Sequence, residues 1–340
     1  MKNCALRNNN FFKEWSNNLN EIKNQEDFET LAIKAFKFQY QNNNVYRQWC
    51  DYTCKEIESI NEVSQIPFLP ISFFKTKDIS SCKEMSAEDY FLSSGTTSMQ
   101  RSKHIIYDKE FYIQNTFNCF EQFFDKVENF CYLCLLPNYL EQTHSSLICM
   151  MDAFVKKSKY KESGFFKDNL KEVASIIKKN EEQGIKTILF GVTYALLDLL
   201  EIQSFQLKNT IVFETGGMKG RRKEISKTEL HEILSKGFGI DSISSEYGMC
   251  ELLSQAYSLG NGLYKTPKQM RICIREVNDR KSNNLVNHSG VINIIDLANI
   301  ATCCFIETED VGRMNEKGEF EILGRLDHSA LRGCNLMYAE

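Results

Sequence analysis

The pattern of hydrophobic and polar positions changes along the chain. Between Asp27 and Phe36 the apolar residues recur at helical spacing, and residues 1–65 as a whole are predicted to be helical and rather polar. The next segment, IPFLPISFF at residues 66–74, contains two prolines, which exclude a helix interior and favour extended backbone. From residue 88 onward, short apolar runs alternate with helical patterns. This alternation predicts an α/β fold with a substantial parallel sheet.

Helix signals are clearest in the middle of the chain. The repeat over residues 108–127 predicts a helix whose apolar face is formed by Ile113, Phe117, Phe120 and Phe124. A second helix is expected over residues 168–183, ended by Gly184. Ser226 and Glu229 form a capping box that predicts the start of a third. Strands are expected at residues 90–92, 105–107, 130–136, 186–192, 210–214, 242–244, 291–297 and 319–323.

Charge and cysteine content narrow the class of protein. The 340 residues include 41 basic and 45 acidic side chains, a net charge of −4, which gives no support for general binding of nucleic acid or anionic membranes. The chain has 13 cysteines and a polar N-terminus without a secretory signal, so we expect a reducing cytosol rather than a disulfide framework. The CxxC pair Cys131 and Cys134 lies in an apolar run and is interpreted as buried strand residues. No apolar stretch reaches the length of a membrane helix.

The first candidate site is Tyr90–Ser98, where a strand runs into the residues SSGTTS. Small residues let a ligand approach the backbone closely, and hydroxyls with amide N–H groups suit phosphate oxygens. Arg101 and Lys103 place cations beside this turn. The spacing is not that of a Walker A loop. A plain polar hairpin is the alternative interpretation.

Two further candidates follow predicted strands. In ETGGMKG, residues 214–220, the paired glycines permit a flat ring to lie on the backbone, although a tight loop would also use glycine. In Ser245–Glu251, Tyr247 offers an aromatic face for a base and Glu251 a hard oxygen for Mg²⁺. The alternative is that Tyr247 packs in the core and Glu251 is solvated.

The last two candidates lie near the end of the chain. Thr308–Arg313 is interpreted as a carboxylate-bearing turn, or simply as a β-turn. The segment Gly324–Leu336 contains several chemically active side chains: Arg325, Asp327, His328, Arg332 and Cys334. A thiol beside Arg332 and a glycine is expected to be accessible and biased toward thiolate. An ordinary tail cysteine is the alternative.

The order of these motifs resembles that of the adenylate-forming superfamily, which includes acyl- and aryl-CoA ligases. Ser94–Ser98 is similar to its phosphate-binding signature and Tyr247–Glu251 to its aromatic-Gly-x-Thr-Glu signature. Asp310 matches its ribose-binding aspartate, and Gly324–Asp327 matches its hinge. Within the superfamily the chain most resembles the acyl-protein synthetases of the LuxE type, through IPFLPISFF, ETGGMKG and the terminal GRLDHSALRGCNL.

The resemblance implies the large N-terminal α/β domain of an adenylate-forming enzyme, with β-sheets flanked by helices. Because 13 residues follow Asp327, we expect the small C-terminal domain and its catalytic lysine to be essentially absent. We expect a helical cap over residues 1–75, an adenylating core over residues 76–325, and a tail over residues 326–340 that carries the acyl-accepting Cys334.

The resemblance also implies the chemistry. ATP and Mg²⁺ would activate a carboxylic acid, expected to be a fatty acid, as acyl-AMP; the acyl group would then pass to Cys334 and on to an acyl reductase or an acyl-carrier protein. Catalysis would rest on Cys334, Arg101 and Glu251, with Glu251 also the metal ligand. The implied nucleotide-binding residues are Ser93, Ser94, Gly95, Thr96, Thr97, Ser98, Gly216, Gly217, Tyr247, Asp310 and Arg325.

Three positions depart from the superfamily pattern: Ser98 stands for a glycine, Arg101 for a lysine and Cys250 for a threonine. Two alternatives therefore stay open. The protein could make an acyl-CoA or load a carrier protein, with Cys334 a bystander, or it could be a non-catalytic nucleotide-binding subunit. His144 either lines the acyl site or caps a helix.

Overall fold

The computed structural model describes residues 9–94, 100–136, 144–167, 169–216, 226–279 and 285–326. The chain forms two compact units, each made of two stretches: Met1–Asn17 with Lys83–Pro267, and Asn18–Cys82 with Lys268–Glu340. These are called the first and the second unit below. The domain boundaries expected at residues 75 and 325 stay a prediction.

The first unit is built on a largely parallel sheet, in the order β10-β9-β8-β7-β6-β4-β5. Strands β4 to β8 pair in parallel, whereas β9 and β10 are antiparallel to their neighbours. The strands are β4 (Cys131–Leu135), β5 (Gly164–Phe165), β6 (Thr187–Val192), β7 (Thr210–Thr215), β8 (Ser244–Tyr247), β9 (Ala256–Ser258) and β10 (Tyr264–Lys265). Every residue of β4 and β6 is buried, as expected for strands covered on both faces.

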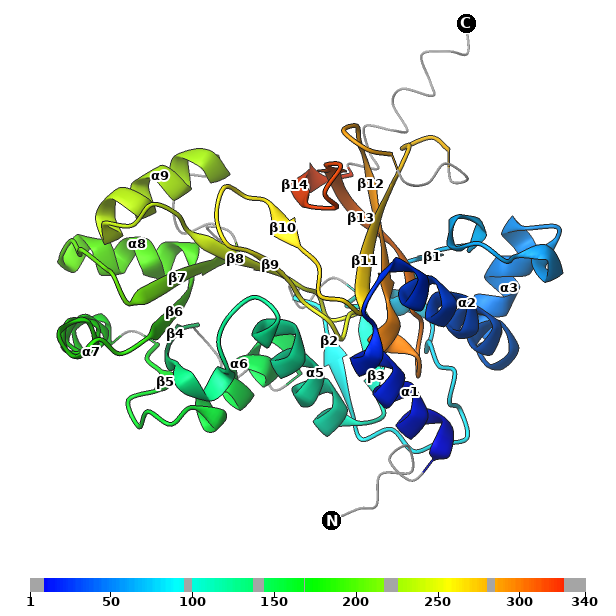
Figure 1. Cartoon of the computed structure of the whole chain (residues 1–340), viewed down its shortest axis with the longest axis horizontal. Helices are drawn as coiled ribbons and strands as arrows, with labels where there is room; N and C mark the ends of the chain where they lie inside the picture. The colour runs from blue at the N-terminus through cyan, green and yellow to red at the C-terminus, as the bar shows by residue number, and fades with distance from the viewer. Residues whose placement is uncertain are drawn as a thin grey trace, which may run out of the picture. The chain divides into compact units, whose positions relative to one another are not determined.

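Helices cover both faces of this sheet. In Figure 1, α8 and α9 lie on one side of the parallel strands and α5 and α6 on the other. The helices of the first unit are α5 (Lys109–Glu121), α6 (Ser146–Lys157), α7 (Leu170–Gln183), α8 (Thr193–Ile202) and α9 (Lys227–Phe238), with the short η3 (Val127–Asn129). A separate antiparallel hairpin is formed by β2 (Asp89–Leu92) and β3 (Lys103–Ile106).

The second unit is a mainly antiparallel sheet, in the order β11-β12-β13-β14, with β1 added in parallel to β13. Its strands are β1 (Leu69–Pro70), β11 (Met270–Arg275), β12 (Ser289–Asp296), β13 (Phe305–Met314) and β14 (Phe320–Arg325). Its helices are α2 (Gln25–Asn42), α3 (Asn44–Thr53), α4 (Phe73–Thr76), η1 (Ile57–Ser59), η2 (Val63–Gln65) and η4 (Leu297–Asn299); α1 (Asn10–Glu21) contributes to both units.

Local sequence signals explain where several helices begin and end. Ser226 Oγ accepts a hydrogen bond from the Glu229 N–H, which confirms the predicted start of α9. Gly184 adopts a left-handed conformation, with φ of 65°, directly after α7, and so ends that helix as predicted. Asp108 caps α5 by accepting from the Phe111 N–H.

Two sequence predictions are wrong in detail. Thr308–Arg313, predicted to be a turn, lies within β13, whose register against β14 shifts between Val311 and Gly312. The helix predicted over residues 108–127 ends at Glu121. Its buried face is also turned relative to the apolar stripe, because Asn115 is buried and satisfied by hydrogen bonds to the Leu253 carbonyl and to Ser254 Oγ.

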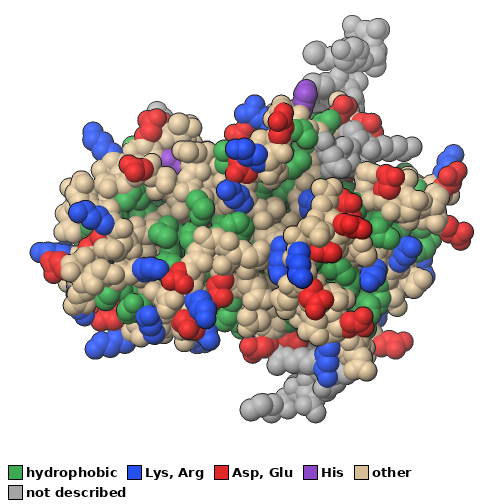
Figure 2. All heavy atoms as spheres, in the orientation of Figure 1, with side chains coloured by type: hydrophobic (Ala, Val, Ile, Leu, Met, Phe, Trp, Pro, Cys, Tyr) green, Lys and Arg blue, Asp and Glu red, His purple; other side chains and the backbone are tan. Residues whose placement is uncertain are grey.

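The distribution of charged side chains on the surface is consistent with the small net charge of the sequence. Acidic and basic side chains are interspersed over the face drawn in Figure 2. None of the helices in the described ranges is both long and apolar enough to cross a lipid bilayer.

Candidate functional site

The predicted phosphate turn has a fixed base at the open end of the β2–β3 hairpin. The Ser93 N–H donates to the Ser102 carbonyl at 3.0 Å, and the Ser102 N–H donates to Ser93 Oγ at 2.9 Å. Arg101 Nε donates to the Ser93 carbonyl at 2.5 Å. These bonds hold both ends of the loop together, while Ser94 and the Arg101 side chain are exposed beside it.

His104 connects this hairpin to the loop that follows β8. Its ring is fully buried, and Nδ1 lies 2.7 Å from the carbonyl oxygen of Cys250. A carbonyl oxygen can only accept, so Nδ1 carries the proton in this hydrogen bond. Burial lowers the pKa of His104 to about 4, so the ring is neutral at physiological pH. No local sequence signal predicts this contact, which joins residues 146 positions apart.

The same contact brings Arg101 into the neighbourhood of Glu251. Glu251 is buried, with 4% of its surface exposed. Burial raises the pKa of the adjacent Cys250 thiol, the charge of Glu251 raises it further, and the charge of Arg101 opposes both. Cys250 Sγ also lies 3.9 Å from the Ser102 carbonyl. The guanidinium of Arg101 and the carboxylate of Glu251 therefore lie close enough to the Cys250 thiol for both charges to affect it.

Strands β6 and β7 deliver a second group of residues to the carboxyl edge of the sheet. They end side by side, with Val192 opposite Thr215. Thr193 Oγ1, one residue further, lies 2.5 Å from Glu214 Oε1 and 2.6 Å from the Gly216 carbonyl oxygen. Gly216 has φ of 70°, a conformation that glycine adopts at no steric cost. Sequence reasoning singled out Gly216 but missed Thr193, which stands inside the apolar run TILFGVTYALL.

Tyr247 ends β8 at the same edge and is buried. Its ring packs edge-on against Tyr264, with centroids 6.0 Å apart. Lys227 Nζ donates to the Tyr264 hydroxyl at 2.8 Å. Tyr264 of β10 thus packs against one side of the Tyr247 ring. The predicted packing in the core is confirmed, and it leaves the predicted contact of Tyr247 with a base possible.

Asp310 and Arg325 form a pair in the second unit. They face each other across β13 and β14, and Arg325 Nε donates to Asp310 Oδ1 at 3.1 Å. The Asp310 carboxylate is buried, whereas the Arg325 side chain is 79% exposed. Two residues that the sequence places 15 positions apart are therefore joined by the strand register.

Several predicted site residues lie outside the described residues: Gly95, Thr96, Thr97, Ser98, Gly217 and Cys334. His144 is described and directly precedes Ser145, the N-cap of α6. Its ring stacks on Tyr90 with centroids 4.0 Å apart, and its backbone carbonyl accepts from the Leu92 N–H at 2.9 Å. In the structure, both the ring and the backbone of His144 therefore contact β2.

A magnesium ion bound here would take most of its ligands from substrate phosphates and water rather than from protein side chains. In the described part of the chain, no three acidic, histidine or cysteine side chains gather closely enough to hold a metal ion. Mg²⁺ commonly binds through one or two carboxylates together with substrate phosphates and water. A single buried carboxylate at Glu251, close to the end of the proposed phosphate turn, fits that mode of binding.

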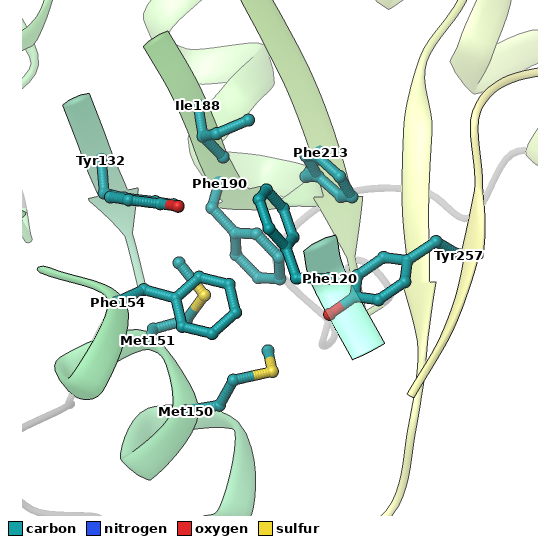
Figure 3. Close-up of a pocket in the computed structure, with 9 residues that line it drawn as sticks. All are labelled: Phe120, Tyr132, Met150, Met151, Phe154, Ile188, Phe190, Phe213 and Tyr257. Carbon is teal, nitrogen blue, oxygen red and sulfur yellow. The ribbon is translucent and has the colours of Figure 1, made fainter. Parts of the chain in front are cut away.

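An apolar cavity lies between the sheet and helices α5 and α6 of the first unit (Figure 3). Its lining is aromatic or aliphatic throughout: Phe120, Tyr132, Met150, Met151, Phe154, Ile188, Phe190, Phe213 and Tyr257. Its volume of about 10 Å³ has room for about one water molecule. In this conformation the aromatic cluster is packed core, and an acyl chain would enter only if side chains such as Met150 moved.

Comparison with known proteins agrees with the sequence resemblance. Residues 12–119 match the family model described as acyl-protein synthetase, LuxE. Over 355 residues the chain is 22% identical to the long-chain-fatty-acid–luciferin-component ligase of Vibrio harveyi, covering 96% of this chain and 90% of that protein.

Among solved structures, an open conformation of 2-hydroxyisobutyryl-CoA ligase, in complex with 2-HIB-AMP and CoA, aligns with 89% of this chain and 70% of its own length. The TM-score is 0.59 at 9% identity, a likeness of fold alone. The chain spans about half, 47%, of ATP-bound MatB from Rhodopseudomonas palustris, at 15% identity and a TM-score of 0.49. The chain is thus similar to LuxE acyl-protein synthetases, most clearly over residues 12–119, and its α/β fold is similar to that of 2-hydroxyisobutyryl-CoA ligase.

Proposed function

We propose that this protein is a ligase that activates a carboxylic acid with ATP and transfers the acyl group to sulfur. A carboxylate oxygen of the acid attacks the α-phosphorus of ATP, the bond from that phosphorus to pyrophosphate breaks, and acyl-AMP forms. The thiolate of Cys334, having lost its proton to solvent, attacks the acyl carbon. The C–O bond to AMP breaks, AMP leaves with the electron pair, and a thioester remains. The names of the relatives support a long-chain fatty acid as the substrate.

The observation that carries this proposal is the hydrogen bond from His104 to the Cys250 carbonyl. It keeps the base of the Ser93–Ser102 turn next to the loop that bears Glu251. A turn rich in hydroxyls and amides, a guanidinium at Arg101 and a buried carboxylate suit the charge of a triphosphate and its metal ion. When bound, Mg²⁺ would neutralise charge on the leaving pyrophosphate, with Glu251 as its protein ligand.

The remaining nucleotide contacts are those that the sequence resemblance implies for each unit taken by itself. Gly216, with Gly217, and the ring of Tyr247 would hold adenine at the carboxyl edge of the sheet, where open α/β sheets bind ligands. Asp310, oriented by Arg325, would accept hydrogen bonds from the ribose hydroxyls. Ribose hydroxyls are donors, so a buried carboxylate already paired with a cation is a suitable acceptor.

The state of the other cysteines supports Cys334 as the nucleophile. Burial raises the pKa of nine thiols: Cys50, Cys82, Cys131, Cys134, Cys149, Cys250, Cys273, Cys303 and Cys304. For Cys82, Cys273 and Cys303 the pKa rises to about 12. Because the thiolate is the reactive form, these groups are poor nucleophiles at neutral pH. Cys334 lies two positions from Arg332 in the sequence, and a cation near a thiol would favour the thiolate.

The activation step is tested by acid-dependent exchange of pyrophosphate into ATP, run with a panel of straight-chain acids. We expect exchange with at least one acid and its loss in Glu251→Gln, which keeps the side-chain size but removes the charge. Glu58→Gln, at an exposed position in η1, is the matched control and should exchange normally. Exchange at the wild-type rate in Glu251→Gln would contradict the metal role. ATP binding without exchange for any acid would favour the non-catalytic alternative.

A further inference from the structure

We infer that Thr193 is a positioning residue for the nucleotide, acting through the carbonyl of Gly216. This inference rests on the proposed function, because Gly216 is expected to contact adenine. Three elements meet at this point: the first residue of α8, the last residues of β7, and α9. Thr193 is 1% exposed and Glu214 is 8% exposed, so the hydroxyl and the carboxylate meet in the protein interior at the edge of the sheet.

The donor count makes Thr193 the link between the two strand ends. Its hydroxyl has one proton, while Glu214 Oε1 and the Gly216 oxygen, at 2.5 and 2.6 Å, are both acceptors. The hydroxyl is therefore shared between the two acceptors, and its contact with Glu214 fixes the position from which it binds the Gly216 carbonyl. On the other side of the carboxylate, His231 Nε2 from α9 lies 3.9 Å from Glu214 Oε2.

The position of Gly216 matters because glycine is conformationally permissive, so the hydrogen bond from Thr193 to its carbonyl is what restrains the backbone at φ of 70°. A peptide rotated after β7 would move the backbone against which a flat base would lie. Loss of the Thr193 hydroxyl should therefore weaken binding of ATP while leaving the acid-binding step unchanged.

The chain provides a matched control at the other end of the same strand pair. Thr210, the first residue of β7, is also buried, and its Oγ1 donates to Glu181 Oε1 at 2.7 Å. Thr210→Val thus removes a similar hydroxyl–carboxylate bond from the amino edge of the sheet, far along the strand from the proposed nucleotide. It should lower thermal stability without changing nucleotide affinity.

The experiment compares Thr193→Val, Thr193→Ser and Thr210→Val in acid-dependent pyrophosphate exchange and in equilibrium dialysis of ATP. We expect Thr193→Val to raise the KM and the Kd for ATP about tenfold, with the KM for the acid within twofold of wild type. Thr193→Ser, which restores the hydroxyl, should return both values to within threefold, and Thr210→Val should leave them unchanged.

Three results would overturn the inference: an ATP Kd within twofold of wild type in Thr193→Val, an equal rise in Thr210→Val, or no rescue in Thr193→Ser. Dialysis separates this outcome from failure of the proposed function. If the wild type binds ATP but exchanges no pyrophosphate with any acid, the ligase proposal fails, whereas a selective loss of ATP binding in Thr193→Val still supports the role of Thr193.

Discussion

The imidazole of His104 and the carbonyl of Cys250 are joined by a 2.7 Å hydrogen bond that links two pieces of the first unit far apart in the sequence. One piece is the β2–β3 hairpin with the predicted phosphate turn, and the other is the loop carrying Glu251. Because the ring is fully buried and neutral, the bond does not depend on ionisation near pH 7.

His104→Gln should lower acid-dependent pyrophosphate exchange at least tenfold and reduce stability. The shorter amide leaves the buried Cys250 carbonyl poorly satisfied, at a cost of about 1 to 3 kcal/mol in the free energy of unfolding. His288→Gln is the control, since His288 is exposed and its Nδ1 contacts the carbonyl of Val286, two residues away. Equal exchange rates in the two variants would mean that the link has no part in activation.

The pH dependence of stability should combine two opposing contributions. Burial raises the pKa of Glu246 to about 7, from an ordinary value of 4.5, and lowers that of His104 to about 4, from 6.5. Between pH 4.5 and 7 the folded state holds the Glu246 proton that the unfolded state has lost, so stability falls as pH rises. Between pH 4 and 6.5 the unfolded state protonates His104 first, so stability rises with pH.

Glu246→Gln should separate these contributions. The substitution removes the Glu246 contribution, which lowers stability as pH rises. The free energy of unfolding of the variant should therefore rise from pH 4 to 6.5. At pH 8 it should exceed that of wild type by up to about 3 kcal/mol, at 1.4 kcal/mol for each pKa unit. Urea denaturation at a series of pH values measures this. Identical wild-type and variant profiles would show that Glu246 is ionised in the folded protein at neutral pH.

Phe120 is the centre of the aromatic core drawn in Figure 3. Its ring contacts those of Phe124, Phe130, Tyr132, Phe154 and Tyr257. Phe120→Ala should cost about 3 to 5 kcal/mol of unfolding free energy, because the surrounding rings cannot fill the space. Tyr52→Ala, at a position 84% exposed, should change stability by less than about 0.5 kcal/mol. A small loss in Phe120→Ala would indicate a loosely packed cluster.

The elements with strong local signals could be predicted from the sequence. Gly184 and Ser226 mark the ends of helices through backbone conformation and capping, which need no distant partner. The β13 segment could not be predicted in this way, because Asp310 and Gly312 are typical turn residues in isolation. Only pairing with β12 and β14 makes this segment a strand.

The residues proposed for function differ in the same way. Tyr247, Glu251 and Asp310 stand in motifs that sequence order reveals. His104 and Thr193 do not, because a histidine in a short strand and a threonine in an apolar run have no special pattern. Their roles appear only when the fold brings Cys250 and Gly216 beside them.

The most direct test of the central claim is the intact mass of the protein after incubation with ATP, Mg²⁺ and a free fatty acid that supports pyrophosphate exchange, compared between wild type, Cys334→Ser and Cys54→Ser. We predict a hydroxylamine-labile acyl adduct on wild type and Cys54→Ser, none on Cys334→Ser, and normal pyrophosphate exchange in all three. A labile adduct that persists in Cys334→Ser would contradict the account.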